Sequence, residues 1–445
     1  MSLDARQTDV QPLTSVEALE ASFRSAERRD SAGLIGLEHE KLLFSAAGTG
    51  AVPYEGAQGV GALLNAFEGD GWAPYREAPG LPVIALTKGS TTISLEPGGQ
   101  FELSGAPHAT ARAAHDENQA HLARLRVHAA AVGQRVVALG YRPFQSLTQM
   151  PWMPKSRYGA MQQTLGRAGS HALHMMLMTA TGQVSLDWRD EADCAKKLTA
   201  SARMTPVTVA LFANSPIVEG AFSGFQSFRS RVWNDVDAAR CGTPTFFVDG
   251  TFSYRRYVEW ALAAPLLFLR RGGQYLTPKL TFGQLLAKGF EGQPALESDW
   301  VDHLSTLFPE VRIKRVLEIR SADANDGPMT GALAALLRGL LYEPRALDEL
   351  TQATKRVTPQ VHRALHLAAQ RDGMRAVAEG VAVKELAKEI VAIAKAGLTR
   401  LDPSDAPLLA PLEAIVSRGA SPAEAVLEAW RTRASDEAFL ARFTL

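Results

Sequence analysis

Two short acidic runs hold the residues of this sequence that are best suited to chemistry. They span residues 36–41 and 94–104, and their acidic and amide members are Glu38, Glu40, Glu96, Gln100 and Glu102. Both runs read as β-strands, in which residues an even number apart share one face. Carboxylates crowded on one face repel each other, and hard oxygen ligands on a rigid sheet favour Mg²⁺ or Mn²⁺ over zinc. The runs therefore predict a divalent-metal site suited to phosphoryl transfer.

Each run also allows a simpler interpretation. Glu38 and Glu40 could face water from an edge strand, but apolar residues at 34, 35, 37 and 42–44 favour a buried strand whose glutamates need a counter-ion. His39 points to the opposite face, where we expect a hydrogen-bonded core histidine. Pro97-Gly98-Gly99 could be a hairpin turn; we expect instead that these glycines let a ligand approach the backbone closely.

Two arginines stand beside loops that can hold a side chain in place. Arg157 follows the proline-rich segment 151–154, and Arg229 lies next to aromatic residues in a glycine-containing segment. A planar guanidinium binds a carboxylate through two parallel hydrogen bonds, as recognition of an amino acid requires. The alternative is that both are exposed, solubilising arginines.

Together with three further motifs, the two runs resemble a known family. The motifs are Met153-Pro154-Lys155-Ser156-Arg157-Tyr158, Phe212-Ala213-Asn214-Ser215-Pro216 and Arg229-Ser230-Arg231-Val232-Trp233-Asn234-Asp235. In this order, from about Gly36 to Glu343, the blocks are similar to the plant and proteobacterial type of glutamate–cysteine ligase, which makes γ-glutamylcysteine for glutathione.

The resemblance implies roles for particular residues. The implied ligands of roughly two or three Mg²⁺ ions, which bridge the ATP phosphates and the glutamate γ-carboxylate, are Glu38, Glu40, Glu96, Glu102 and Glu318. Glu318 enters through Leu317-Glu318-Ile319-Arg320-Ser321-Ala322-Asp323, which is similar to a strand end of the family. The same comparison implies that Arg157 and Arg229 contact the substrate glutamate or phosphate.

Further contacts follow from strand faces. Arg320 shares a strand face with Glu318 and could reach the transferring phosphoryl group, although a plain charge pair at a sheet edge would look the same. Residues 179–187 alternate so that five polar side chains face water or a ligand, and the family uses this strand as the floor of its substrate site. Relatives commonly have Asn where this chain has Ser185, so Gln183 is the better candidate for a contact. Lys41 and Lys155 are candidate phosphate contacts.

Composition excludes several functional classes. The 445 residues contain 47 Lys and Arg against 47 Asp and Glu, so no overall field attracts nucleic acid or an anionic membrane. The N-terminus lacks the apolar core of a secretory signal, and the most apolar stretch, residues 257–269, is too short to span a bilayer and predicts a buried helix. Two cysteines cannot build a disulfide framework. We therefore expect a cytoplasmic protein with free thiols.

The order of expected elements predicts an α+β fold with an antiparallel sheet that forms a bowl. Expected helices cover residues 60–67, 110–132 and 191–211, and later strands cover residues 175–188, 245–252 and 312–320. After about residue 330 the pattern is helical. We expect a catalytic region over residues 1–330 and a helical region over 331–445 that packs on it without being independent.

These observations favour an ATP-dependent ligase that phosphorylates the γ-carboxylate of L-glutamate and transfers the acyl group to the amine of L-cysteine. Positioning and charge neutralisation supply most of the catalysis in such reactions. The alternatives are a ligase with another amine acceptor, a carboxylate-metal hydrolase, and a silent relative that acts as a binding partner. We expect a monomer that glutathione inhibits by feedback and that is insensitive to reductant.

Overall fold

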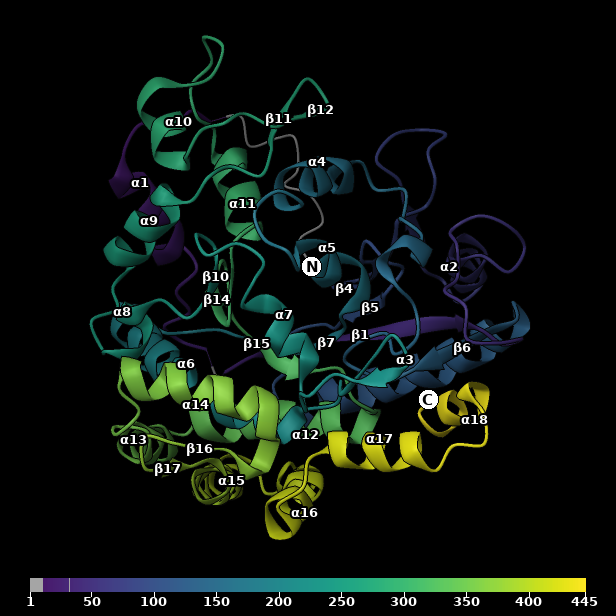
Figure 1. Ribbon diagram of the computed structural model, residues 1–445. Helices are drawn as coiled ribbons and strands as arrows, with labels where there is room; N and C mark the ends of the chain where they lie inside the picture. Colours follow the sequence, from purple (N-terminus) through teal and green to yellow (C-terminus); the bar gives the residue numbers. More distant parts are fainter. Residues whose placement is uncertain (1–10, 32) are drawn as a thin grey trace.

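The computed structural model describes residues 11–31 and 33–445, and a mixed helix and sheet architecture is its main feature (Figure 1). The described part holds a nine-stranded sheet in the order β14-β15-β7-β1-β5-β4-β3-β2, with β6 paired to the far end of β1. Neighbouring strands run antiparallel throughout this sheet. Its strands are β1 (Ile35–Ser45), β2 (Ala73–Tyr75), β3 (Ala85–Lys88), β4 (Thr91–Leu95), β5 (Phe101–Ser104), β6 (Gln134–Val137), β7 (Thr181–Leu186), β14 (Val311–Ile313) and β15 (Leu317–Asp323). The predicted α+β class with an antiparallel sheet is confirmed.

One face of the sheet is covered by three long helices, α3 (Ala111–Ala131), α6 (Glu191–Phe212) and α12 (Gly327–Leu341). The two helices predicted over 110–132 and 191–211 are therefore present. Helix α12 is apolar on almost all sides because it lies between the sheet and further helices, and it packs on α3 and α15. Burial of these faces removes apolar surface from water, which is the main stabilising term of such a layer.

Above the opposite face of the sheet lie α4 (Ser156–Leu165), α5 (Ala172–Met178) and α7 (Phe228–Trp233) (Figure 1). These helices are short, and two of them carry arginines in their first turn. Polar side chains of the sheet point toward this side. This second face therefore forms the floor of the site described below.

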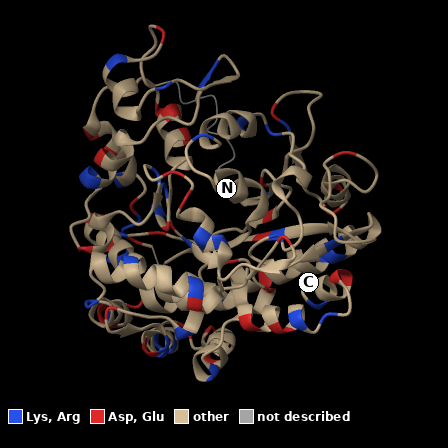
Figure 2. Cartoon of the chain, in the orientation of Figure 1, with Lys and Arg blue, Asp and Glu red and all other residues tan. Residues whose placement is uncertain are grey.

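The remaining elements surround this core. Before the C-terminal region, the remaining helices are α1 (Val16–Arg24), α2 (Val60–Glu68), η1 (Leu147–Gln149), α8 (Thr245–Val248), α9 (Tyr254–Ala263), α10 (Phe282–Lys288) and α11 (Glu297–Ser305). The short strand pairs are β8 (Ile217–Val218) with β9 (Ala221–Phe222), β10 (Cys241–Gly242) with β13 (Phe308–Pro309), and β11 (Leu269–Arg271) with β12 (Gln274–Leu276). Figure 2 shows charges of both signs spread over these elements.

The C-terminal region is helical, as predicted, apart from one small hairpin. It contains α13 (Pro344–Ala353), α14 (Pro359–Asp372), η2 (Gly373–Arg375), β16 (Val377–Ala378), β17 (Val381–Ala382), α15 (Val383–Leu401), η3 (Ala406–Leu409), α16 (Ala410–Arg418), α17 (Pro422–Arg431) and α18 (Asp436–Arg442). Buried side chains of α12, α15 and α16 belong to the same hydrophobic cluster as those of β7 and β15. The division at residue 330 stays a prediction.

Four expected elements differ from the structure. Residues 175–188 form the end of α5 and then β7, because the run 172–178 is rich in Leu, Met and Ala, which are good helix formers. Residues 245–252 begin with helix α8, since a short apolar run does not distinguish a strand from a helix. Residues 312–320 form a hairpin of β14 and β15. The expected helix 257–269 ends at Ala263, before Pro265.

Candidate active site

Strand β1 brings the two acidic runs together at the centre of the sheet. It lies between β5 and β7, so that Glu40 is opposite Glu102 and Glu38 is opposite Gln183. Directly opposite residues on neighbouring strands bring their side chains within contact distance on the same face. The carboxylates line one pocket, which we call the acidic pocket; its residues are Glu38, Glu40, Glu96, Glu102, Lys155, Arg157, Tyr158, Met161, Gln183, Ser305, Phe308, Arg312 and Arg320.

The carboxylates of the acidic pocket perturb each other. Burial, reinforced by the charge of Glu102, raises the pKa of Glu96 to about 7. Burial also raises the pKa of Glu40 well above its usual range, and the charges of Glu96 and Glu102 add to this effect. A divalent cation would remove this repulsion, and oxygen donors are those that Mg²⁺ prefers. The donor set therefore fits such an ion.

The carboxylates supply oxygen atoms for a metal ion, but in the described part of the chain they are not arranged as a complete metal site. Within residues 11–31 and 33–445, no group of three Asp, Glu, His or Cys side chains converges on one point as a preformed metal site. One oxygen of Glu40 accepts a hydrogen bond from the backbone N–H of Thr181 at 3.0 Å, and Glu102 accepts from the hydroxyl of Ser104 at 2.6 Å. These contacts hold the carboxylates near the floor of the pocket.

The segment 96–100 is a hairpin turn between β4 and β5, which corrects the expectation of a ligand-binding glycine loop. The backbone N–H of Glu96 donates to the carbonyl of Gln100 at 3.0 Å. A Cβ on Gly98 would lie 2.2 Å from the carbonyl oxygen of Leu177, so the glycine makes room for the end of α5. Gln100 donates to the carbonyls of Met176 and Thr179, and it therefore anchors α5.

Four cationic side chains line the acidic pocket together with the carboxylates: Lys155, Arg157, Arg312 and Arg320. Arg157 follows the proline-rich segment, as expected, and lies in the first turn of α4, of which Lys155 is the N-cap. Its Nη2 donates to the hydroxyl of Ser305 at 3.2 Å. Lys155 and Arg157 are both buried, which excludes the alternative of a solubilising arginine at position 157.

Glu318 differs from the other predicted metal ligands, because its oxygens are engaged by cations. Arg312 contacts one oxygen through Nε and Nη2, both at 2.6 Å, and Lys314 contacts the other at 2.6 Å. Burial would raise the pKa of Glu318, but the charges of Arg312, Lys314 and Arg320 outweigh it and lower the pKa far below the usual range. The structure does not bring Glu318 to the wall of the acidic pocket. Its observed contacts are those of an organiser of the cations.

Arg320 and Gln183 contact each other at the centre of the floor. Arg320 Nη1 donates to Oε1 of Gln183 at 2.5 Å and lies 3.7 Å from Glu318. A register shift between Ile319 and Ala322 interrupts the pairing of β15 with β7. Such bulges re-aim side chains. Both residues line the acidic pocket, as the strand pattern predicted for Gln183.

Arg229 opens a second compartment next to the first. It lies in the first turn of α7, rather than in a loop as expected, and it is 3% exposed. The compartment, which we call the methionine pocket, is lined by Glu40, Glu96, Pro97, Gln100, Met161, Met175, Met176, Thr179, Thr181, Arg229, Trp233, Phe308 and Arg320. It shares Glu40 and Glu96 with the acidic pocket. A ligand that bridges both could therefore meet the carboxylates at the junction.

Lys41 is not brought to this site. It alternates with Glu40 and points with His39 to the side of the sheet that α3 covers. His39 contacts the side chain of Asn118 at 3.2 Å and the carbonyl of Asn325 at 2.9 Å, so the predicted core histidine is confirmed. Burial lowers the pKa of Lys41 to about 7, and its Nζ has no hydrogen-bond partner in the described part of the chain.

Sequence reasoning missed several pocket residues. An unbroken strand over residues 312–320 would place Arg312 and Glu318 on one face, because their spacing is even. In the structure the two residues lie on different strands, directly opposite each other in the β14–β15 hairpin. Trp233 stands inside a quoted motif, four residues after Arg229, and this helical spacing could have found it. Ser305 and Phe308 carry no local signal, because tertiary packing alone brings them to the site.

Comparisons with known proteins show the family of this chain. A family model described as glutamate-cysteine ligase family 2 matches residues 34–441. The chain belongs to this family. It is 36% identical over 423 residues to the chloroplastic glutamate–cysteine ligase of Brassica juncea, which covers 94% of this chain and 81% of the relative. It is 34% identical to the chloroplastic glutamate–cysteine ligase B of Oryza sativa subsp. japonica, over 95% of this chain and 85% of the relative.

A solved structure shares the fold of this family member. The glutamate–cysteine ligase of Francisella tularensis in complex with AMP superposes with a TM-score of 0.59 at 13% sequence identity, over 93% of this chain and 87% of that one. No helix among the described residues is long and apolar enough to cross a membrane.

Proposed function

We propose that this protein joins the γ-carboxylate of L-glutamate to the amine of L-cysteine at the expense of ATP, as the first step of glutathione synthesis. One observation carries the proposal: in a member of the glutamate-cysteine ligase family, four glutamates on or next to strands of the central sheet line one pocket together with four cationic side chains. Carboxylates and cations together can hold a metal-bound polyphosphate beside an acidic substrate.

Glu38, Glu40, Glu96 and Glu102 are the residues that would hold Mg²⁺. The mutual repulsion that raises the pKa of Glu40 and Glu96 supports this assignment, because it is the cost that a bound cation removes. When bound, the ions would neutralise charge on the phosphates and on the γ-carboxylate. Glu318 is a weaker candidate for a ligand, since three cations already surround it.

The cations of the acidic pocket suit the phosphates of ATP. Lys155 and Arg157 lie at the start of α4, and Arg312 and Arg320 lie on the β14–β15 hairpin. In the proposed reaction an oxygen of the γ-carboxylate attacks the γ-phosphorus and ADP leaves. The neutral amine nitrogen of cysteine then attacks the acyl carbon, phosphate leaves, and the nitrogen loses a proton. Fixed cations stabilise the charge that moves in both steps.

Glutamate would bind at the junction of the two pockets. Arg229 offers a guanidinium at the wall of the methionine pocket, and its Nε has no hydrogen-bond partner in the described part of the chain. A guanidinium in this position suits the α-carboxylate of an amino acid. The γ-carboxylate would then lie toward Glu40 and Glu96, where the two pockets meet.

Three expectations remain proposals. The monomeric state, feedback inhibition by glutathione and a cytoplasmic location rest on the sequence and the resemblance. The names of the plant relatives place those proteins in chloroplasts.

Release of ADP, measured with L-glutamate and Mg·ATP while amino acids and amines are supplied singly, tests the proposal. We expect release that requires glutamate and is fastest with L-cysteine. A clear preference for another amine would indicate a ligase with a different acceptor. ADP formation without any amine, together with phosphate, would indicate a hydrolase and contradict the proposal.

A further inference from the structure

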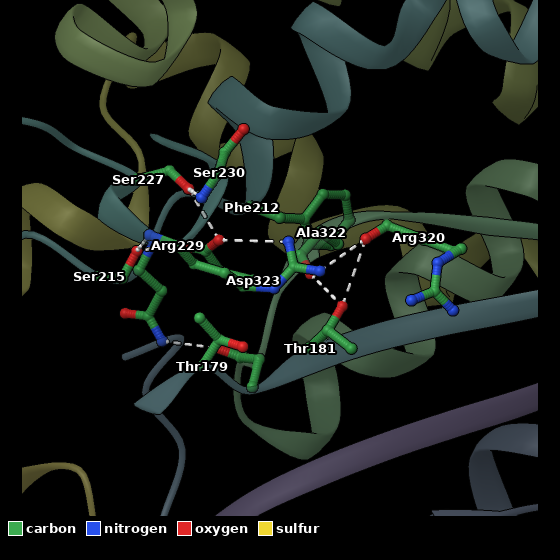
Figure 3. A network of polar contacts seen from close by, with 12 residues as sticks. Thr179, Thr181, Phe212, Ser215, Ser227, Arg229, Ser230, Arg320, Ala322 and Asp323 are labelled. Carbon is green, nitrogen blue, oxygen red and sulfur yellow. Dashed lines mark hydrogen bonds and ion pairs between the residues drawn. The ribbon is translucent and has the colours of Figure 1, made fainter. Parts of the chain in front are cut away.

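Asp323 is a buried carboxylate at the end of β15 that lines neither pocket, although it lies close to both. Its side chain is 1% exposed. One oxygen accepts from the backbone N–H of Asn214 at 2.8 Å and from the hydroxyl of Ser215 at 2.6 Å. The other accepts from the hydroxyl of Ser227 at 2.8 Å (Figure 3). A burial of this kind is costly unless each oxygen finds donors, as it does here.

Both serines pass the contact on to helix α7. The hydroxyl of Ser215 accepts from the backbone N–H of Arg229 at 3.0 Å. Ser227 is the N-cap of α7, and its hydroxyl accepts from the N–H of Ser230 at 3.2 Å. Two serines therefore connect the first turn of α7 to Asp323 by hydrogen bonds, and this turn carries Arg229.

The guanidinium of Arg229 is oriented by the same strand end. Its Nη1 lies 3.8 Å from Asp323, and its Nη2 donates to the backbone carbonyl of Arg320 at 2.8 Å (Figure 3). That carbonyl lies where the pairing of β15 with β7 shifts register. The end of β15 thus holds both terminal nitrogens of Arg229, and this fixes the position of the arginine in the wall of the methionine pocket.

The absence of a side chain at Gly140 leaves space for the carboxylate of Asp323. A Cβ on Gly140 would lie 2.6 Å from Cβ and 2.7 Å from Cγ of Asp323, so a side chain at position 140 would displace the carboxylate. The N–H of Gly140 donates to the carbonyl of Asn214, whose own N–H contacts Asp323. The strand end, residue 140 and the loop 214–215 form one rigid support.

We propose that Asp323 is a positioning residue that fixes helix α7 and so aims Arg229 at the carboxylate of the amino-acid substrate. Trp233, one turn further along the same helix, also lines the methionine pocket. The inference rests on the proposed role of Arg229 in binding glutamate. Asp323 itself touches no substrate in this account.

A double-mutant cycle tests the proposal. Arg229→Lys, Asp323→Asn and the double variant are compared by kcat and KM for L-glutamate and for ATP. Asp323→Asn keeps the shape but sets an NH₂ group where donors already point. We expect a loss of about 10-fold in kcat/KM for glutamate in the wild-type background, with the KM for ATP unchanged, and less than about 2-fold in the Arg229→Lys background.

Asp405→Asn is the matched control. Asp405 is also fully buried, accepts from the first backbone N–H groups of α3 at Ala111 and Arg112, and lies 3.3 Å from Arg338, but it lines neither pocket. We expect this variant to lose stability while its KM for glutamate stays unchanged. A similar rise in KM for both variants would show a general effect of buried aspartates and overturn the proposal.

If Asp323→Asn does not fold, Ser227→Ala takes its place in the test. This variant removes the hydroxyl that connects Asp323 to α7 and leaves the carboxylate in place. The cycle is then built on Ser227→Ala and Arg229→Lys. Equal losses in both backgrounds would overturn the role of Asp323 while leaving Arg229 as a glutamate contact. An unchanged KM for glutamate in Arg229→Lys alone would instead contradict the proposed function of Arg229.

Discussion

Removing one negative charge from the acidic pocket should stabilise the metal-free protein. Removing the negative charge that the neighbouring cations surround should destabilise it. Glu96→Gln and Glu318→Gln make the same chemical change on adjacent parts of the site. Glu96 lies among carboxylates, whereas Glu318 is surrounded by Arg312, Lys314 and Arg320. The two variants therefore differ in the sign of the expected effect.

The magnitude follows from the pKa of Glu96, which is about 7 in the folded protein against a usual value of 4.5. Because the folded-state value is the higher one, the stability contributed by protonated Glu96 is complete below about pH 4.5 and is lost as the pH rises through about 7. At pH 8 the ionised group costs about 3 kcal/mol. With an unfolding entropy of about 2 cal/mol/K per residue, Glu96→Gln should raise Tm by about 3–4 °C.

Glu318→Gln should act in the opposite direction. The surrounding cations lower the folded-state pKa of Glu318, so its stability is present above the unfolded-state pKa and lost as the pH falls. Removing one partner of a buried ion pair costs about 3–5 kcal/mol, because the remaining charges stay buried. Tm should therefore fall by a few degrees at pH 8.

Thermal unfolding is measured in EDTA at pH 8 and at pH 5, and again with Mg²⁺ at pH 8. For Glu96→Gln we expect the rise in Tm at pH 8 to shrink to less than half at pH 5, and the stabilisation by Mg²⁺ to be smaller than in the wild type. A lower Tm of Glu96→Gln at pH 8, as for Glu318→Gln, would refute the idea that the carboxylates repel each other.

Three further predictions follow from the site. Glu102→Gln should abolish product formation while the protein remains folded, as judged by circular dichroism; wild-type turnover would remove this residue from the metal site. Arg157→Lys should raise the KM for ATP by about 10-fold and leave that for glutamate unchanged, since the fork faces the acidic pocket; the reverse pattern in initial-rate kinetics would contradict this assignment. Activity should be equal in dithiothreitol and in mild oxidant, because Cys194 and Cys241 are free thiols whose pKa values burial raises; a several-fold change that the Cys194→Ser/Cys241→Ser variant abolishes would refute it.

Much of the floor of the site could be predicted from the sequence, because a strand fixes which residues share a face. Glu38 and Glu40 were placed on one face and His39 on the other by alternation alone, and the structure agrees. The same rule separates Lys41 from the glutamates, so its selection as a phosphate contact went against the pattern. Glu102 and Gln183 come beside β1 through strand pairing, which alternation alone does not specify.

The walls of the site could not be predicted in the same way. Arg157 was expected directly after a loop and Arg229 in one, but both lie in first turns of short helices whose caps are Lys155 and Ser227. Helices of 6 to 10 residues carry a weak periodic signal. The saturation of Glu318 by three cations depends on the hairpin of β14 and β15, which an unbroken strand over 312–320 could not reveal.

Transfer of oxygen from glutamate to phosphate tests the central claim most directly. L-glutamate labelled with ¹⁸O in the γ-carboxylate is turned over with Mg·ATP and L-cysteine, and the phosphate and the peptide are analysed by mass spectrometry. If the γ-carboxylate attacks the γ-phosphorus, one labelled oxygen appears in phosphate for each γ-glutamylcysteine formed. Phosphate that carries only unlabelled oxygen, or that forms at the same rate without glutamate, would contradict the account.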